Sequence, residues 1–316
     1  MASDIFEILR GRPGDPDYEK KGVIVQGITG AYGSLHTRNM IAYGTNVMAG
    51  VTPGKGGRTF NGNGNGNGGI PIYNTVKEAV DATGAKMSAV FVPAKFFLGA
   101  VKEALEAGIK LLVAIPEHIP IRDTMEALSM AREAGAIIIG PNTPGVMIPG
   151  IIKIGIMPPT PFKPGRIAVL SKSGTLLYEI SDALSGAGFG QCITIGIGGD
   201  PVNGTRLVDA FEMVRHVADL DGMVIVGEIG GDSEEILAQR MMDTGFSKPT
   251  VAYIAGRAAP KEKRMGHAGA IVMGTYGSAE SKISMFSKAG IPVAKKPAEV
   301  PVLLAGRMTG SRGGND

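Results

Sequence analysis

The sequence predicts an α/β protein in which two doubly wound parallel sheets follow one another along the chain. Short apolar, β-branched runs alternate with amphipathic helical stretches, which is typical of strands buried on both faces by helices. A proline-rich segment interrupts the alternation near the middle, and glycine turns follow several strands. The length of 316 residues suits two domains. Glycine supplies 48 of these residues, about twice its usual share, so the glycine turns require an explanation.

In the first half, the alternation begins at residue 22. Strands are expected at residues 22–26, 46–51, 88–92, 110–115 and 136–139. Helices are expected at residues 35–43, 75–83, 94–106 and 121–133. Residues 1–21 are expected to form a short leader ahead of the fold. Residues 61–69 (NGNGNGNGG) are expected to be a flexible surface insertion, because glycine and asparagine alone supply no core.

A second set of elements follows the proline-rich stretch 157–165 (MPPTPFKPG). We interpret that stretch as a linker, because prolines at this density continue neither a helix nor a central strand. Strands are then expected at residues 166–170, 193–197, 222–226 and 249–254. Helices are expected at residues 175–187, 205–216, 233–243 and 278–289. The predicted domains are therefore residues 22–160 and 161–308, followed by a disordered tail at 309–316.

Composition and charge argue against several classes of protein. The net charge of +3 and the lack of aromatic residues interleaved with basic ones give no reason to expect a nucleic-acid partner. The single cysteine, Cys192, excludes an intramolecular disulfide and a cysteine-based zinc site, and no metal site is expected. No apolar run reaches the roughly 18 residues of a membrane span, and residues 1–21 resemble neither a secretory nor a transit signal. We therefore expect a cytoplasmic protein without a membrane partner.

The first strand leads into a glycine turn, Gly27-Ile-Thr-Gly30-Ala-Tyr-Gly33, that opens a helix. A strand, glycine turn and helix in this order are typical of a phosphate site. No acidic residue follows before Glu78, although an NAD site needs one for the ribose hydroxyls. Lys55 follows the second strand instead, and a cation there suits a ribose that bears a phosphate, as in NADP or coenzyme A (CoA). The lack of an obvious hydride-transfer constellation favours CoA.

Three further turns follow strands of the second half. Residues 171–175 (SKSGT) open a helix, whose N-terminus would bind an anion; a Walker A loop is absent from the sequence. The turns at 196–201 (GIGGDP) and 227–231 (GEIGG) follow the next strands, and the second of them carries Glu228. Because open α/β sheets gather ligands at the carboxyl ends of their strands, the three turns are expected to form one site.

His267 is the candidate nucleophile. It lies between Gly266 and Gly269, which leave its ring accessible, and three basic residues, Lys261, Lys263 and Arg264, precede it. A histidine can carry a phosphoryl group when a carboxylate holds the proton on its other ring nitrogen. Glu228 is the available carboxylate, so we predict that it orients His267.

Together these motifs resemble the α subunit of succinyl-CoA synthetase (succinate–CoA ligase). The resemblance runs from about residue 22 to residue 297 and rests on GITGAYG, VTPGKGG, PNTPGV, KIGIMP, SKSGTLLYE, GIGGDP, GEIGG and KRMGHAGAI. It implies a Rossmann-like CoA-binding domain followed by a flavodoxin-like domain with a transiently phosphorylated histidine. It also implies a separate β subunit of ATP-grasp fold, which binds ATP or GTP with Mg²⁺.

The resemblance implies roles for individual residues. His267 would be the phosphohistidine and Glu228 its orienting partner. The residues implied to contact CoA are Thr29, Gly30, Ala31, Tyr32, Lys55, Ile115, Pro116 and Glu117. The residues implied to bind phosphate are Ser173, Gly174 and Thr175, and Tyr178 would line the site of the acid. The implied reaction is the reversible formation of acyl-CoA from a small carboxylic acid, CoA and a nucleoside triphosphate, through an acyl phosphate and a phosphohistidine.

The chain departs from the family pattern at Lys95, His118, Thr143 and Lys172, which lie in the motifs near CoA and the acid. Succinate is the first expectation for the acid, and malate and citrate remain open. A catalytically silent CoA-binding regulatory protein and an NADP-dependent reductase are the alternatives from other classes. A single-chain synthetase is disfavoured, because the chain lacks an ATP-grasp region.

Overall fold

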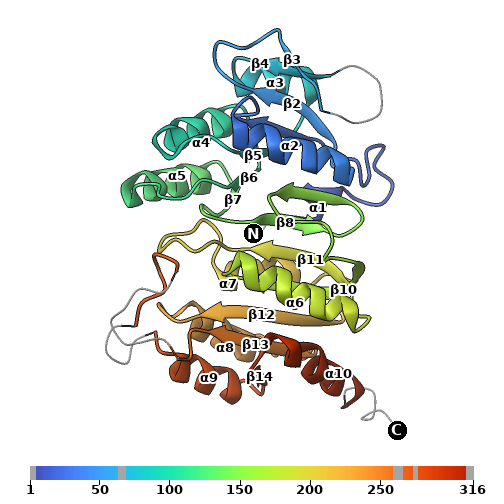
Figure 1. Ribbon diagram of the computed structural model, residues 1–316, viewed down its shortest axis with the longest axis vertical. Helices are drawn as coiled ribbons and strands as arrows, with labels where there is room; N and C mark the ends of the chain where they lie inside the picture. The colour runs from blue at the N-terminus through green and yellow to red at the C-terminus, as the bar shows by residue number, and fades with distance from the viewer. Residues whose placement is uncertain (1–4, 63–68, 259–265, 273–276, 311–316) are drawn as a thin grey trace.

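Two seven-stranded sheets lie one above the other along the long axis of the computed structural model (Figure 1). The structure describes residues 5–62, 69–258, 266–272 and 277–310. Most of the predicted glycine–asparagine insertion (63–68) and the predicted tail beyond 310 therefore lie outside the described residues, as do the basic residues Lys261, Lys263 and Arg264.

The first sheet has the strand order β3-β4-β2-β1-β5-β6-β7. Its strands are β1 (Val23–Gln26), β2 (Val47–Val51), β3 (Thr59–Phe60), β4 (Ile70–Tyr73), β5 (Met87–Val90), β6 (Leu111–Ala114) and β7 (Ile137–Ile139). All neighbouring strands run parallel except the β3–β4 pair. Without β3, the order is that of a Rossmann fold, which confirms the predicted class of the first half. The short strands β3 and β4 were not predicted.

The second sheet has the order β14-β13-β12-β10-β11-β8-β9. Its strands are β8 (Gly145–Ile148), β9 (Ile152–Gly155), β10 (Pro164–Ser171), β11 (Gln191–Gly196), β12 (Gly222–Glu228), β13 (Thr250–Ala255) and β14 (Val293–Ala294). The strands β10 to β14 are parallel and follow the flavodoxin-like order. The predicted fold of the second half is therefore confirmed.

The antiparallel hairpin of β8 and β9 extends the second sheet beside β11 and was not predicted. The chain thus passes from the first sheet to the second between β7 and β8, before the proline-rich segment on which the predicted boundary at 160 rests. That segment is also only partly a linker, because β10 begins at Pro164. Proline is tolerated as the first residue of a strand, where its missing N–H costs no ladder bond.

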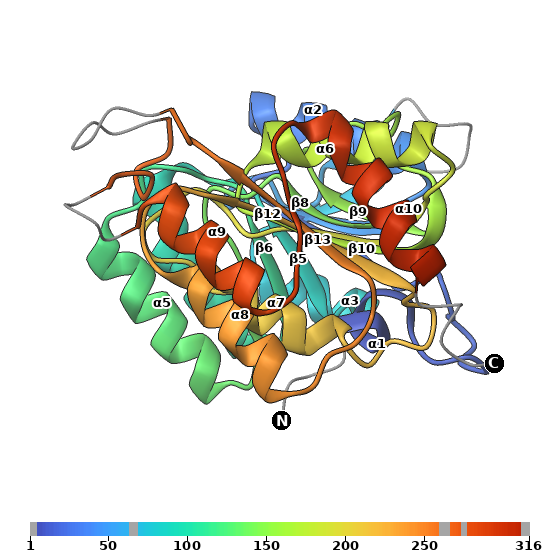
Figure 2. The same cartoon turned by 90° about the horizontal axis from the view of Figure 1, so that it is seen from below.

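Helices cover both faces of each sheet (Figure 2). The first half contains α2 (Ala31–Tyr43), α3 (Val76–Thr83), η1 (Ala94–Phe96), α4 (Phe97–Glu106) and α5 (Ile121–Glu133). The second half contains α6 (Gly174–Gly186), α7 (Leu207–Val214), α8 (Ser233–Asp243), α9 (Ala279–Lys288), η2 (Pro297–Glu299) and α10 (Val300–Gly310). Along β12, Ile225 packs in the core with α7, α8 and α9, whereas Val224 and Val226 pack in the core with α6 and α10. Alternate side chains of one strand therefore serve opposite layers. None of the described helices has the length and apolar character that crossing a membrane requires.

The two ends of the chain correct the sequence prediction. Residues 5–10 form helix α1 (Ile5–Arg10), and Leu9 is fully buried in a core cluster that runs through both sheets. The ion pair between Arg10 and Asp219 (3.6 Å) joins α1 to the second half of the chain. This part of the predicted leader is therefore part of the fold. At the other end, α10 continues to Gly310, so the first two residues of the predicted tail are helical.

Candidate functional site

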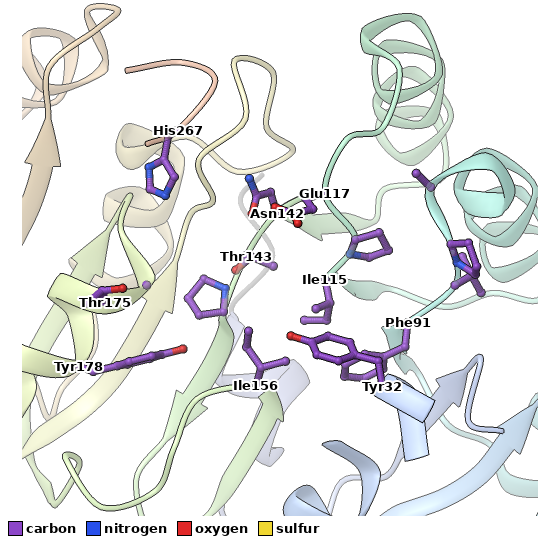
Figure 3. Close-up of a pocket in the computed structure, with 16 residues that line it drawn as sticks. Tyr32, Phe91, Ile115, Glu117, Asn142, Thr143, Ile156, Thr175, Tyr178 and His267 are labelled. Carbon is purple, nitrogen blue, oxygen red and sulfur yellow. The ribbon is translucent and has the colours of Figure 1, made fainter. Parts of the chain in front are cut away.

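Both sheets open toward one cavity at the carboxyl ends of their strands. In each sheet the strand order reverses beside the first parallel strand, at β1 and β5 in the first sheet and at β10 and β12 in the second. Ligands bind at such switch points in open α/β sheets. The cavity has a volume of about 730 Å³. Residues from the first half that line it include Tyr32, Phe91, Ile115, Pro116 and Glu117, and those from the second include Gly174, Thr175, Tyr178 and His267 (Figure 3).

His267 and Glu228 are in contact, as the sequence predicted. Nδ1 of His267 lies 2.7 Å from Oε2 of Glu228, the last residue of β12. The His267 ring packs against Gly199, where any Cβ would collide with it, so the glycine turn after β11 is required for this placement. The hydrogen bond to Glu228 raises the pKa of His267 above its usual value of 6.5, although burial and Lys172 oppose the rise. With Nδ1 bonded to the carboxylate, Nε2 is left as the free ring nitrogen.

A network of buried charges holds Glu228 in place. Its backbone N–H donates to Oε1 of Glu234 (3.0 Å), which is fully buried. Oε2 of Glu234 accepts a hydrogen bond from Lys282 Nζ (2.6 Å), and Lys172 Nζ lies 3.6 Å from Oε1. Burial alone would raise the pKa of Glu234, but Lys172 and Lys282 hold it below its usual value. Glu234 and Lys282 were not predicted from the sequence, because a glutamate in the first turn of a helix and a lysine on a polar helix are ordinary surface patterns.

The predicted phosphate-binding residues divide into two groups. The hydroxyl of Ser173 caps α6 by accepting the N–H of Leu176 (3.3 Å), and Ser173 does not line the cavity. Gly174 and Thr175 do line it, as His267 does. As the first residues of the helix, they present backbone N–H groups without intrahelical partners at the positive end of the helix dipole. This end of α6 can therefore bind an anion in the cavity that His267 also lines.

The predicted CoA-binding residues also fall into two groups. Tyr32, Ile115, Pro116 and Glu117 line the cavity, whereas Thr29, Gly30, Ala31 and Lys55 do not. Nζ of Lys55 donates to the hydroxyl of Thr29 (3.0 Å), which places the lysine at the carboxyl ends of β1 and β2. The structure therefore brings Lys55 to the glycine turn that the sequence predicted as a phosphate site.

Tyr178 lies on the cavity wall, on the same side as Thr175 (Figure 3). Burial raises the pKa of its hydroxyl to about 12, so it remains a hydrogen-bond donor at neutral pH. Asn142 and Thr143 lie between the two walls (Figure 3), and neither was predicted as a site residue. The amide of Asn142 donates to Asp200 (2.9 Å). The two residues lie 58 positions apart, so no local sequence pattern predicts this contact. Among the described residues, no group of three or more His, Cys, Asp or Glu side chains is placed to hold a metal ion.

Comparison with known proteins identifies the class. A model of the CoA binding domain matches residues 18–118, and a model of the CoA-ligase family matches residues 170–291. The chain is therefore a CoA-binding protein of the CoA-ligase class. It is 47% identical over 287 residues to ADP-forming succinate–CoA ligase subunit alpha 2 of Archaeoglobus fulgidus, covering 91% of this chain and 97% of that protein. It is 48% identical over 285 residues to the corresponding subunit alpha of Aquifex aeolicus, covering 90% and 91%. The chain belongs to the family of succinate–CoA ligase alpha subunits.

A solved structure shares the fold. ATP citrate lyase from Methanothrix soehngenii, determined in complex with citrate and coenzyme A, matches 93% of this chain with a TM-score of 0.83 and 24% identity. The match covers 51% of that chain, so the present chain corresponds to about half of it.

Proposed function

We propose that this chain is the catalytic α subunit of a nucleoside-diphosphate-forming acid–CoA ligase, with succinate as the acid. The observation that carries the proposal is the His267–Glu228 pair, whose imidazole opens on a cavity shared with Tyr32 and Glu117. A phosphoryl carrier beside a CoA site is the arrangement that acid–CoA ligation through a phosphohistidine requires. The relatives named succinate–CoA ligase support the choice of acid.

The chemistry proceeds in three transfers. Nε2 of neutral His267 attacks the terminal phosphorus of a nucleoside triphosphate, forming an N–P bond as the diphosphate leaves. A carboxylate oxygen of the acid then attacks the same phosphorus, the N–P bond breaks, and an acyl phosphate forms. Finally the CoA thiolate attacks the acyl carbon and inorganic phosphate leaves. Glu228 retains the proton on Nδ1 and stabilises the charge on the phosphorylated ring.

Other residues of the cavity bind and orient. The N–H groups of Gly174 and Thr175 stabilise the phosphoryl oxygens near His267, and Ser173 holds that turn in shape. The glycine turn after β1, with Thr29, Gly30, Ala31 and Lys55, binds CoA phosphates. Tyr32, Ile115, Pro116 and Glu117 contact CoA farther along the cavity, and the Tyr178 hydroxyl donates to the acid.

A second subunit completes the enzyme. The relatives carry the name subunit alpha, which supports a β partner for this chain. We infer that this partner has the ATP-grasp fold, binds ATP or GTP with Mg²⁺, and joins the α chain as a heterodimer or heterotetramer in the cytoplasm.

The test uses the chain copurified with its β partner. We expect γ-phosphate-labelled ATP or GTP to label the α chain with base-stable, acid-labile phosphate, and His267→Asn to abolish this labelling. His216→Asn changes an exposed histidine and serves as the matched control. The complex should then form acyl-CoA faster from succinate than from malate or citrate. Labelling that persists in His267→Asn would overturn the assignment, and labelling without turnover on any acid would point to a regulatory protein.

A further inference from the structure

The two oxygens of Glu228 have unequal partners. Oε2 bonds the imidazole of His267, whereas Oε1 is buried and has no hydrogen-bond partner among the described residues. Lys172 Nζ lies 3.9 Å from that oxygen and 3.6 Å from Oε1 of Glu234. Both separations exceed hydrogen-bond length. Lys172 therefore stands between two carboxylates and is fixed to neither.

The second cation of the network is held quite differently. Lys282 is fully buried, and its ammonium donates to the carbonyl of Gly231 (2.9 Å), to Glu234 (2.6 Å) and to Glu235 (2.9 Å). These three bonds use all of its donors. Lys282 thus fixes the groups that hold Glu228. Lys172 instead lines a separate cavity of about 420 Å³, and its ammonium makes no hydrogen bond to any described residue.

His267 must satisfy two opposing demands. Its Nδ1 needs the Glu228 carboxylate nearby, but a carboxylate at that distance also favours protonation of Nε2. A doubly protonated ring has no lone pair with which to attack phosphorus. Asp200, from the loop after β11, also raises the pKa of His267, whereas Lys172 lowers it. Asp232 and Arg206 are the other charged residues that line the smaller cavity.

We propose that Lys172 is a positioning residue for phosphoryl transfer: its ammonium offsets the charge of Glu228, so that His267 keeps its Nδ1–H bond while protonation of Nε2 is disfavoured. The proposal rests on the proposed role of His267 as the phosphoryl carrier. Lys172 acts through charge: its ammonium lies beside the carboxylates of Glu228 and Glu234, and its positive charge also disfavours protonation of the His267 ring.

The test follows the imidazole of His267 directly. Full-length chain with isotope-labelled histidine is titrated by NMR, and His267→Asn assigns the signal. We expect the titration midpoint of His267 to rise by about one pH unit in Lys172→Met and in Lys172→Gln. It should keep the wild-type value in Lys172→Arg, which retains the charge. Lys102→Met, which removes an exposed lysine of α4, is the matched control for net charge.

A second readout links the midpoint to the reaction. In the complex with the β partner, we expect the acid limb of the pH–rate profile for phosphorylation to move to higher pH by the same amount. At a pH below the limb, this corresponds to about a tenfold slower reaction. A purely structural lysine would not move this limb.

Two results would overturn the proposal. One is an unchanged midpoint in a folded Lys172→Met or Lys172→Gln chain. The other is a loss of folding in both variants while Lys172→Arg folds, because Lys172 would then be structural. The NMR titration does not depend on turnover. A wild-type chain that fails to accept phosphate would therefore contradict the proposed function. The NMR titration of the Lys172 variants would still test whether Lys172 affects protonation of His267.

Discussion

Nδ1 of His267 lies 2.7 Å from Oε2 of Glu228, although 39 positions separate the two residues in the chain. The contact joins the carboxyl end of β12 to a loop that passes over the turn after β11. The carboxylate is buried and the imidazole lines the cavity, so the hydrogen bond fixes a ring that a ligand in the cavity can reach.

Replacing Glu228 by Gln should slow phosphorylation of His267 by about 10²- to 10⁴-fold. The pKa of His267 is raised in the folded chain, so the rate should increase with pH as Nε2 loses its proton. Without the carboxylate the pKa falls toward 6.5, and the acid limb should move to lower pH. Labelling rates measured from pH 5 to 9 test this, with Glu280→Gln on the exposed face of α9 as control. An unchanged limb would show that Glu228 does not set the proton on the ring.

Gly199→Ala should abolish phosphorylation while the chain remains folded. The added Cβ would overlap the His267 ring, which must then leave its place beside Glu228. Gly186→Ala, at the end of α6, meets no atom within 4 Å and is the matched control. Circular dichroism and labelled ATP report fold and reaction separately. Normal labelling of Gly199→Ala would mean that the ring reacts from another position.

Lys55→Met should weaken CoA binding about tenfold, because a charge-assisted hydrogen bond to a phosphate is lost. If Lys55 binds the ribose phosphate, the variant and the wild type should bind dephospho-CoA equally well. Calorimetric titration with both ligands distinguishes this contact from a general loss of positive charge. Lys77→Met, on the exposed side of α3, controls for net charge. Equal weakening toward both ligands would place Lys55 elsewhere on CoA.

Leu9→Ala should lower the free energy of unfolding by about 2–5 kcal/mol. Leu9 is fully buried in the core cluster shared by both sheets, so the substitution leaves a cavity. Ile8, on the same helix, is only partly buried, and Ile8→Ala should cost less. Urea unfolding of the two variants provides the comparison. Small and equal decreases in the free energy of unfolding for both variants would show that residues 5–10 do not stabilise the fold.

Lys153→Met should stabilise the chain by about 2 kcal/mol at pH 7, because it removes a desolvated ammonium. Nζ of Lys153 is buried against the carbonyl of Met157 (2.9 Å). Burial lowers its pKa from 10.5 to about 8, so the unfolded chain binds more protons between those values. The free energy of unfolding of the wild type should therefore increase with pH between about 8 and 10.5, and the variant should lack this increase. Urea unfolding at pH 7, 8 and 9.5 tests this, with the exposed Lys110→Met as control.

Local pattern was sufficient for much of the architecture. The helices at 121–133 and 233–243 were predicted with the bounds that the structure shows. Their periodicity and flanking breakers lie within one stretch of chain, so no distant contact was needed. By contrast, α1 and the hairpin of β8 and β9 were missed. The helix and both strands are short, and α1 and β8 pack or pair with residues far along the chain.

The sequence by itself determined the alternation of strands and helices, the glycine turns after the strands, and the types of residue that carry the chemistry. These features depend on neighbours within a few positions, where propensity and periodicity act. Only the tertiary structure decided that Tyr32 and His267 share one cavity and that Lys172 faces Glu228. The physical reason is that parallel sheets bring the carboxyl ends of non-adjacent strands together, so the charges that surround a buried group are set by topology and not by spacing in the chain.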